Sequence, residues 1–293
     1  MEIIRISDLH DGRLEMYTEL NEVQLKRYYE PAGGVFVAET ELVISRALEA
    51  GCRPISFLVE GRCFEGGTLG ELLNMADSAF KGSGPMGIRP VGPDPDASDT
   101  SSLPVYVAPL DVINSLTGYN LTRGVLCAMR RPEPRPAESL LRYGTRVCIL
   151  EDVMNPTNVG AIFRSAAALG VDAVLLTEGC SDPLYRRAAR VSMGTVFALP
   201  FAFFDKGSDY MDIIHREGYT TVSMALKENA VPLSSPQLKG HDRLAVIFGT
   251  ESTGIKDETI AASDYTAIIP MQNGVDSLNV AAASAVTFWE LCK

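Results

Sequence analysis

The chain has 293 residues, of which 46% are hydrophobic, and a formal net charge of -11. It is longer than the ~150 residues of a typical domain, which predicts two domains, each with enough apolar residues for its own core. The acidic balance excludes a protein that coats nucleic acid with its whole surface, because lysine and arginine supply that affinity. A nucleic-acid partner would have to meet a local basic patch.

The amino-terminal segment does not have the pattern expected of a targeting or membrane signal. Residues 1–11 are charged and lack an apolar core, and no run of the chain approaches the ~18–20 apolar residues that span a bilayer. We therefore expect a cytoplasmic protein with no membrane association. The cysteines lie in apolar surroundings without a Cys-x-x-Cys pair, which predicts small buried side chains and no zinc site. They are Cys52, Cys63, Cys127, Cys148, Cys180 and Cys292.

The first half of the chain predicts a small α/β domain over residues 1–130. Residues 77–103 are rich in Gly, Pro, Ser and Asp and lack periodicity, which predicts a flexible surface insertion. Apolar segments on either side predict strands at Val35–Val37, Ile55–Glu60, Val105–Ala108 and Val125–Met129, and helices at Glu41–Ala50, Leu69–Met75 and Leu110–Thr117.

A proline-spaced connector, Arg131–Pro136, opens a predicted linker over residues 131–145. Strands and helices then alternate through a predicted second domain, residues 146–293. Continuous apolar strands between helices are typical of a parallel sheet covered on both faces, where ligands bind beyond the carboxyl ends of the strands. The predicted strands are Val147–Leu150, Ala173–Leu176, Val196–Phe203, Thr220–Met224, Leu244–Phe248 and Ala267–Ile269, and the helices are Val159–Leu169, Leu184–Arg190, Met211–Arg216 and Val280–Leu291.

Three loops at predicted strand ends carry polar residues, and the first is 155–164. Thr157 or Asn158 is expected to cap the helix that this loop enters. Arg164 lies off the buried face of that helix among small residues, so that another chain or a substrate can approach its guanidinium. Taken alone, a solvated arginine on an outward face is the more common situation.

The second loop, Gly249–Gly254, directly follows an apolar strand. It has the outer glycines of a dinucleotide-binding loop, but Glu251 replaces the middle glycine, and a carboxylate there would repel a pyrophosphate. The chain also lacks a Gly-x-x-x-x-Gly-Lys-Ser/Thr phosphate loop, so nucleotide di- and triphosphates and a nicotinamide-dependent oxidoreductase are disfavoured. Taken alone, the loop also fits a simple strand-to-helix turn.

The third loop joins the strand that ends at Ile269 to an alanine-rich helix that begins at Val280. Its polar part, Gln272–Ser277, is irregular in pattern. A binding site and a structural connection in which Ser277 caps the helix explain this loop equally well when it is taken alone.

In this order and spacing the three loops resemble those of the SpoU/TrmH-type RNA 2'-O-ribose methyltransferases of the SPOUT superfamily. The resemblance covers residues 146–293 and rests on three separate motifs at strand ends. The preceding domain is similar, more weakly, to the ribosomal-protein-like substrate-binding domain of these enzymes, chiefly over Val35–Leu48. The resemblance implies methyl transfer from S-adenosylmethionine to a ribose 2'-hydroxyl of structured rRNA or tRNA.

The resemblance also implies a deep trefoil knot, an exception to the rule that chains avoid knots, and a homodimer with a shared active site and no metal. S-adenosylmethionine carries a sulfonium cation and lacks phosphate, so the carboxylate of Glu251 can lie beside it. The residues implied in cofactor binding are Gly249, Ile269 and Leu278 through their backbone, with Met271, Val280, Ala225, Leu226 and Gly254 completing the pocket.

The residues that match the reactive set of this family are Asn158, Arg164, Glu251, Ser277 and Asn279. A guanidinium with a pKa above ~12 is a poor base, so we expect Arg164 to clamp a phosphate and stabilise the developing 2'-oxyanion. The proton then leaves to that phosphate or to Glu251. We expect an in-line transfer whose rate comes mostly from positioning.

A short arginine cluster predicts where RNA phosphates bind. Arg186, Arg187 and Arg190 share one side of a predicted helix end, and Arg190–Gly194 is similar to a stretch of the same family. For Arg186 and Arg187, a salt-bridged surface helix is an equal alternative. A non-catalytic RNA-binding assembly factor with the same knotted dimer is the alternative function, and the intact reactive set argues against it.

Overall fold

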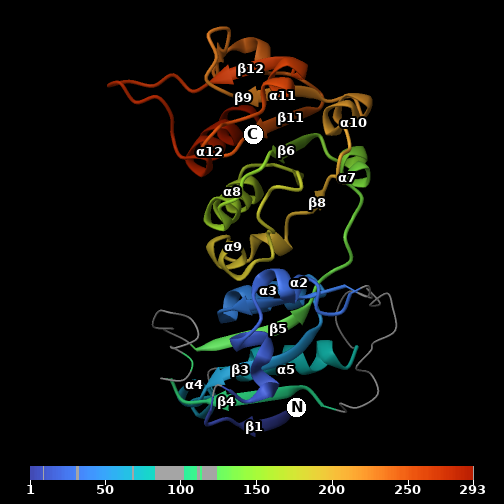
Figure 1. Cartoon of the computed structure of the whole chain (residues 1–293), viewed down its shortest axis with the longest axis vertical. Coiled ribbons are helices and arrows are strands. Elements are labelled where there is room, and N and C mark those ends of the chain that lie inside the picture. The colour runs from blue at the N-terminus through green and yellow to red at the C-terminus, as the bar shows by residue number, and fades with distance from the viewer. Residues whose placement is uncertain are drawn as a thin grey trace. The chain divides into compact units, whose positions relative to one another are not determined.

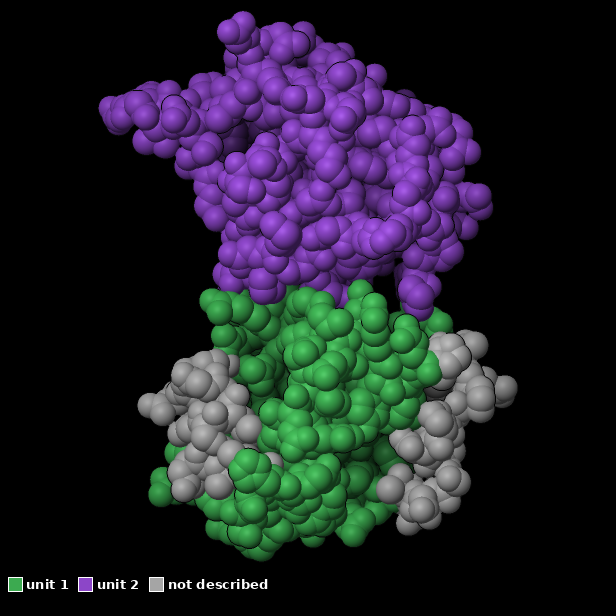
Figure 2. Space-filling model, viewed as in Figure 1, with its two compact units in different colours: residues 1–133, 184–197 green, residues 134–183, 198–293 purple. Residues whose placement is uncertain are grey.

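The computed structural model describes residues 1–8, 10–30, 33–67, 69–82, 102–110, 113 and 124–292. They divide into two compact units, shown in different colours in Figure 2. None of the helices in this described part is long and apolar enough to cross a membrane. Unit 1 comprises Met1–Glu133 and Leu184–Phe197, and unit 2 comprises Pro134–Pro183 and Ala198–Lys293.

Unit 1 is built on a mixed five-stranded sheet whose order is β1-β4-β3-β5-β2. The pairs β1/β4 and β4/β3 are parallel, and the pairs β3/β5 and β5/β2 are antiparallel. The strands are β1 (Glu2–Arg5), β2 (Val35–Glu39), β3 (Pro54–Glu60), β4 (Pro104–Ala108) and β5 (Val125–Arg130). The helical segments are η1 (Gly12–Leu14), α1 (Glu15–Thr18), α2 (Glu22–Lys26), α3 (Glu41–Glu49), α4 (Gly61–Glu65), α5 (Gly70–Phe80), α9 (Arg186–Val191) and η2 (Thr195–Phe197).

The ends of unit 1 elements differ from the prediction in two places. Helix α5 continues to Phe80 because Ala76 extends its buried face, so the first residues of the expected insertion 77–103 are helical. The rest of that insertion, from 83 to 101, lies outside the described residues. So does most of the helix expected at 110–117.

Unit 2 contains a seven-stranded sheet in the order β10-β12-β9-β11-β6-β7-β8, and every pairing in it is parallel. The predicted parallel α/β sheet is confirmed. The strands are β6 (Arg146–Leu150), β7 (Ala173–Leu176), β8 (Phe201–Phe203), β9 (Thr220–Met224), β10 (Val231–Pro232), β11 (Leu244–Phe248) and β12 (Tyr265–Ile268). The helical segments are α7 (Ala137–Tyr143), α8 (Pro156–Ala168), α10 (Tyr210–Arg216), η3 (Pro236–Leu238), α11 (Asp257–Ala262) and α12 (Val280–Leu291).

Alternate residues of the central strands face two helical layers. Ile149 of β6 and Ile247 of β11 pack in one cluster with residues of α7, α10 and α11. On the opposite face α8 packs against α12, and Phe288 of α12 makes an edge-to-face contact with Phe248 at 5.6 Å between ring centroids. The first and last long helices of unit 2 therefore share one face of the sheet (Figure 1).

One prediction about unit 2 was wrong in part. The strand expected at Val196–Phe203 is a 3-10 turn followed by the short strand β8, because Pro200 between them has no N–H for a ladder. The connector Arg131–Pro136 is non-helical, as predicted, and helix α7 begins directly after it, within the expected linker 131–145. A proline directly before a helix is compatible with helix entry.

Candidate active site at the carboxyl ends of four parallel strands

The carboxyl ends of β12, β9, β11 and β6 lie along one edge of the unit 2 sheet. These strands are neighbours in that order and run parallel, so the loops that follow them leave from the same edge. The loops are residues 151–155, 225–230, 249–256 and 269–279. Figure 1 shows the last of them reaching away from β12 before it returns to α12.

Three of the predicted reactive residues meet in a chain of hydrogen bonds. Asn279 Nδ2 donates to Asn158 Oδ1 at 3.1 Å, and Asn158 Nδ2 donates to Glu251 Oε1. A carboxylate only accepts, so Glu251 fixes which end of the Asn158 amide faces it, and Asn279 fixes the other end. Asn158 is only 7% exposed, which holds this orientation in place.

Helix caps explain why two of these asparagines are where they are. Asn155, rather than Thr157 or Asn158, caps α8 by accepting from the N–H of Thr157 at 2.9 Å, which corrects the predicted cap. Asn158 therefore lies one turn into the helix with its side chain free for Glu251. Asn279 caps α12 by accepting from the N–H of Ala281 at 3.0 Å.

The loop that carries Glu251 is closed on itself. The N–H of Gly254 donates to Thr250 O at 3.0 Å, and Gly254 has a positive φ of 74°. A Cβ at Gly249 would overlap the backbone of Gly254, so only glycine fits there. The turn therefore holds Glu251 at an exposed tip next to Asn158.

The residues implied in cofactor binding border the same loops. Ala225 follows β9 directly, and its N–H donates to Ala267 O of β12 at 3.2 Å. Leu226 and Leu278 are exposed apolar side chains, while Ile269, Met271 and Val280 are half-buried. Together with Gly249 and Gly254, these residues lie after β9, β11 and β12.

Two members of the predicted reactive set lie apart from the hydrogen-bonded three. Arg164 is exposed and makes no hydrogen bond or ion pair within the described residues. A helix turns by about 100° per residue, so six residues place Arg164 about 120° around α8 from Asn158. Ser277 lies exposed in the loop before α12 and is likewise without a partner in the part of the chain that the structure describes.

The predicted RNA-binding arginines belong to unit 1, on α9. Arg190 donates to the carboxylate of Glu39 at 3.1 Å, and Arg186 lies 4.0 Å from the other oxygen of that group. Glu39 is buried, which raises its pKa, and the two guanidinium groups act in the opposite direction. Arg187 is exposed. The role of these arginines in RNA binding stays a prediction.

Sequence reasoning missed a buried carboxylate beside the site. Glu151 follows β6 directly and accepts hydrogen bonds from the N–H of Lys256 at 2.7 Å, from Thr259 Oγ1 at 2.6 Å and from Tyr210. The next residue, Asp152, pairs with Lys256 Nζ at 2.9 Å. The available signal was an acidic pair directly after an apolar strand.

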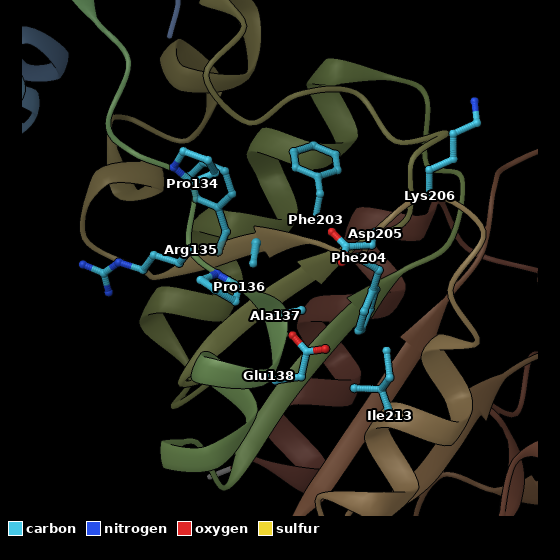
Figure 3. A pocket seen from close by; sticks show the side chains of 12 residues that line it. Pro134, Arg135, Pro136, Ala137, Glu138, Phe203, Phe204, Asp205, Lys206 and Ile213 are labelled. Atoms are coloured by element: carbon cyan, nitrogen blue, oxygen red, sulfur yellow. The ribbon is translucent and has the colours of Figure 1, made fainter. Parts of the chain in front are cut away.

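A separate hollow of about 480 Å³ lies between the start of α7 and the strand β8. In Figure 3, Phe203 and Phe204 line one part of it and Pro134 lines another, while Lys206 points outward. No predicted site residue lines this hollow. Its walls are mostly apolar.

Comparisons with known proteins show which family and which solved structures the chain resembles. Residues 145–289 match the SpoU rRNA Methylase family. An uncharacterized tRNA/rRNA methyltransferase of Mycobacterium bovis is 33% identical over 292 residues, covering 99% of this chain and 92% of that protein. A 23S rRNA (guanosine-2'-O-)-methyltransferase of Acinetobacter baylyi is 28% identical over 205 residues, covering 68% of this chain and 82% of that protein.

Among solved structures, the AdoMet-bound rRNA methyltransferase from Sinorhizobium meliloti has a TM-score of 0.75 to this chain at 20% sequence identity. The alignment covers 98% of this chain and 97% of that one. At this identity the likeness concerns the fold.

Proposed function

The chain belongs to the SpoU rRNA methylase family, and on that basis we propose that it transfers the methyl group of S-adenosylmethionine to the 2'-hydroxyl of a ribose in ribosomal or transfer RNA. The observation that carries the proposal is the meeting of Asn158 from helix α8, Glu251 from the loop after β11 and Asn279 from the start of α12. The relatives named as 23S rRNA 2'-O-methyltransferases support the same acceptor. An RNA target of this kind supports a cytoplasmic location.

The composition of the loops fits the methyl donor. Residues 249–254 and 269–280 contain no lysine or arginine and carry the carboxylates Glu251 and Asp276. This environment suits a sulfonium cation and disfavours phosphate. We assign adenosine recognition to the backbone at Gly249, Ile269 and Leu278. When bound, S-adenosylmethionine supplies an electrophilic methyl group.

The protein groups then act on the ribose. Arg164 stays cationic, so it binds an RNA phosphate and stabilises the 2'-oxyanion as the hydroxyl proton leaves. That proton goes to the same phosphate or to the carboxylate of Glu251. Asn158 and Asn279 hold Glu251 in place, and Ser277 completes the set from the exposed loop.

We propose that two copies of the chain share each active site. Helix α12 has no charged residue from Val280 to Trp289, yet Val286 is 42% and Trp289 is 57% exposed on one stripe with Ala282. An apolar helix face of this kind is normally covered. Arg164 lies about 120° around the neighbouring helix α8 from Asn158 and is exposed, and we propose that a second copy packed on this face brings its own Arg164 to the site.

The finer architecture is part of the same proposal. The last helix, α12, packs on α8, the first long helix of unit 2, which supports a deep trefoil knot at this place. We assign RNA binding to residues 1–130 and methyl transfer to residues 146–293, joined by residues 131–145. A crystal structure traced continuously through residues 240–292 tests the knot.

Mixing two inactive variants tests the shared site. Arg164→Ala and Glu251→Ala should each abolish methyl transfer to RNA from cells that lack this enzyme. Their heterodimers keep one site with both groups, so a refolded mixture should regain about a quarter of the wild-type rate. A mixture that forms heterodimers and stays inactive would contradict the shared site.

The same samples separate the enzyme from the alternative assembly factor. An enzyme binds S-adenosylmethionine in calorimetry and transfers its tritiated methyl group to RNA. A chain that binds RNA without binding the methyl donor would favour the non-catalytic alternative.

A further inference from the structure

Glu151 is a buried carboxylate that takes no part in the chemistry proposed above. It is 1% exposed at the carboxyl end of the central strand β6. A buried charge is tolerated when hydrogen-bond donors surround it, and Lys256 N–H, Thr259 Oγ1 and Tyr210 supply them. The fold has therefore assembled a specific set of donors around this one group.

These bonds place Glu151 at both ends of the loop that carries Glu251. The backbone N–H of Glu151 donates to Phe248 O at 2.8 Å, at the last residue of β11. Its side chain accepts from the N–H of Lys256 at 2.7 Å, just after the loop ends. Glu151 is therefore bonded to the chain on both sides of the loop 249–255. The hydrogen bond from Gly254 N–H to Thr250 O closes this loop further.

The position of this loop decides where Glu251 lies. Asn158 lies on α8, which follows β6 through the loop that begins with Glu151. A shift of Glu151 would therefore move Asn158 and Glu251 relative to each other. Asp152 adds to the anchor through its ion pair with Lys256 Nζ at 2.9 Å. The bonds to Tyr210 and Thr259, by contrast, reach α10 and α11 and do not hold the loop directly.

We propose that Glu151 is a positioning residue, which fixes the loop 249–255 and so sets the affinity for the methyl donor without touching it. This inference rests on the proposed function. It differs from a purely structural role because only one of the three bonds to the Glu151 side chain, the one from Lys256 N–H, should control cofactor binding. The others should affect stability alone.

Two substitutions at Lys256 isolate that bond. Lys256→Ala removes the ion pair with Asp152 and keeps the backbone N–H. Lys256→Pro removes both, and the φ of -59° at this position suits proline. Measured by calorimetry on the full chain, the Kd for S-adenosylmethionine should be about tenfold higher for Lys256→Pro than for Lys256→Ala.

Substitutions at Glu151 and Tyr210 provide the matched controls. Glu151→Gln keeps an oxygen for Lys256 N–H, and its amide can donate to the hydroxyl groups of Tyr210 and Thr259, so its Kd should stay within about threefold of wild type. Glu151→Ala should raise the Kd about tenfold or more. Tyr210→Phe should lower the thermal midpoint and leave the Kd unchanged.

The outcomes separate this inference from the proposed function. Equal Kd values for Lys256→Pro and Lys256→Ala would overturn the positioning role, as would a Tyr210→Phe variant whose Kd rises as much as that of Glu151→Ala. A wild-type chain that binds no S-adenosylmethionine would overturn the proposed function itself. Should Glu151→Ala fail to fold, the Lys256 pair still decides the question.

Discussion

Asn279 both caps α12 and donates a hydrogen bond within the proposed active site, and the substitution Asn279→Asp separates these two contacts. The aspartate still caps α12, because Asn and Asp are equally good at this position and a negative charge suits a helix amino terminus. It cannot donate to Asn158 Oδ1, where the present bond measures 3.1 Å. Asn158 then loses the contact that orients it toward Glu251.

The size of the effect follows from that lost bond. Leaving a buried acceptor unpaired costs about 1–3 kcal/mol, which corresponds to about 5- to 150-fold in rate if the orientation matters only in the reaction. Single-turnover transfer of tritiated methyl to RNA should show this loss, while the thermal midpoint should fall less for Asn279→Asp, which keeps the cap, than for Asn279→Ala. Asn279→Ala should lose the cap as well, and with it about 1 kcal/mol of stability. An Asn279→Asp variant with wild-type turnover would refute the role of this bond.

Further predictions concern the loop 249–254, the proposed dimer and the stability of the fold at low pH. Gly249→Ala should lower the thermal midpoint by about 4 °C or more because its Cβ has no room, whereas Gly70→Ala, whose Cβ meets open space, should not lower it. If two copies pair as proposed, Trp289→Asp should give a monomer in light scattering, and Tyr143→Asp, at a residue that is 89% exposed on another helix, should keep the mass of the wild-type dimer. Burial raises the pKa of Asp152, but hydrogen bonds from its lysine and threonine partners hold that pKa below its ordinary value. The carboxylate therefore stabilises the fold above about pH 4 and loses this effect as the pH falls through the lowered pKa, so Asp152→Asn should lower the urea midpoint at pH 7 and differ less from wild type toward pH 2.

Much of unit 2 was predictable because its strands are short apolar runs between clear turn signals. The structure places Ala173–Leu176, Thr220–Met224 and Leu244–Phe248 where the pattern predicts them. The pattern failed where local chemistry interrupts an apolar run, as Pro200 does. It also missed α7, which begins directly after the prolines of the expected linker.

The candidate site was likewise predictable only in part from the sequence. Asn158, Glu251 and Asn279 were identified by motif, and the structure brings them together through hydrogen bonds that no spacing along the chain reveals. Glu151 escaped notice because its side-chain partners lie 59 to 108 residues further along the sequence. The pairing of Arg190 with Glu39 spans 151 residues and was hidden for the same reason.

The central claim is that this chain methylates a ribose 2'-hydroxyl in RNA, and ribose-methylation mapping of total RNA tests it most directly. Cells with the wild-type chain should show a methylated ribose position that is unmethylated both in cells without the chain and in cells with only Glu251→Ala. Identical maps from all three would contradict the claim.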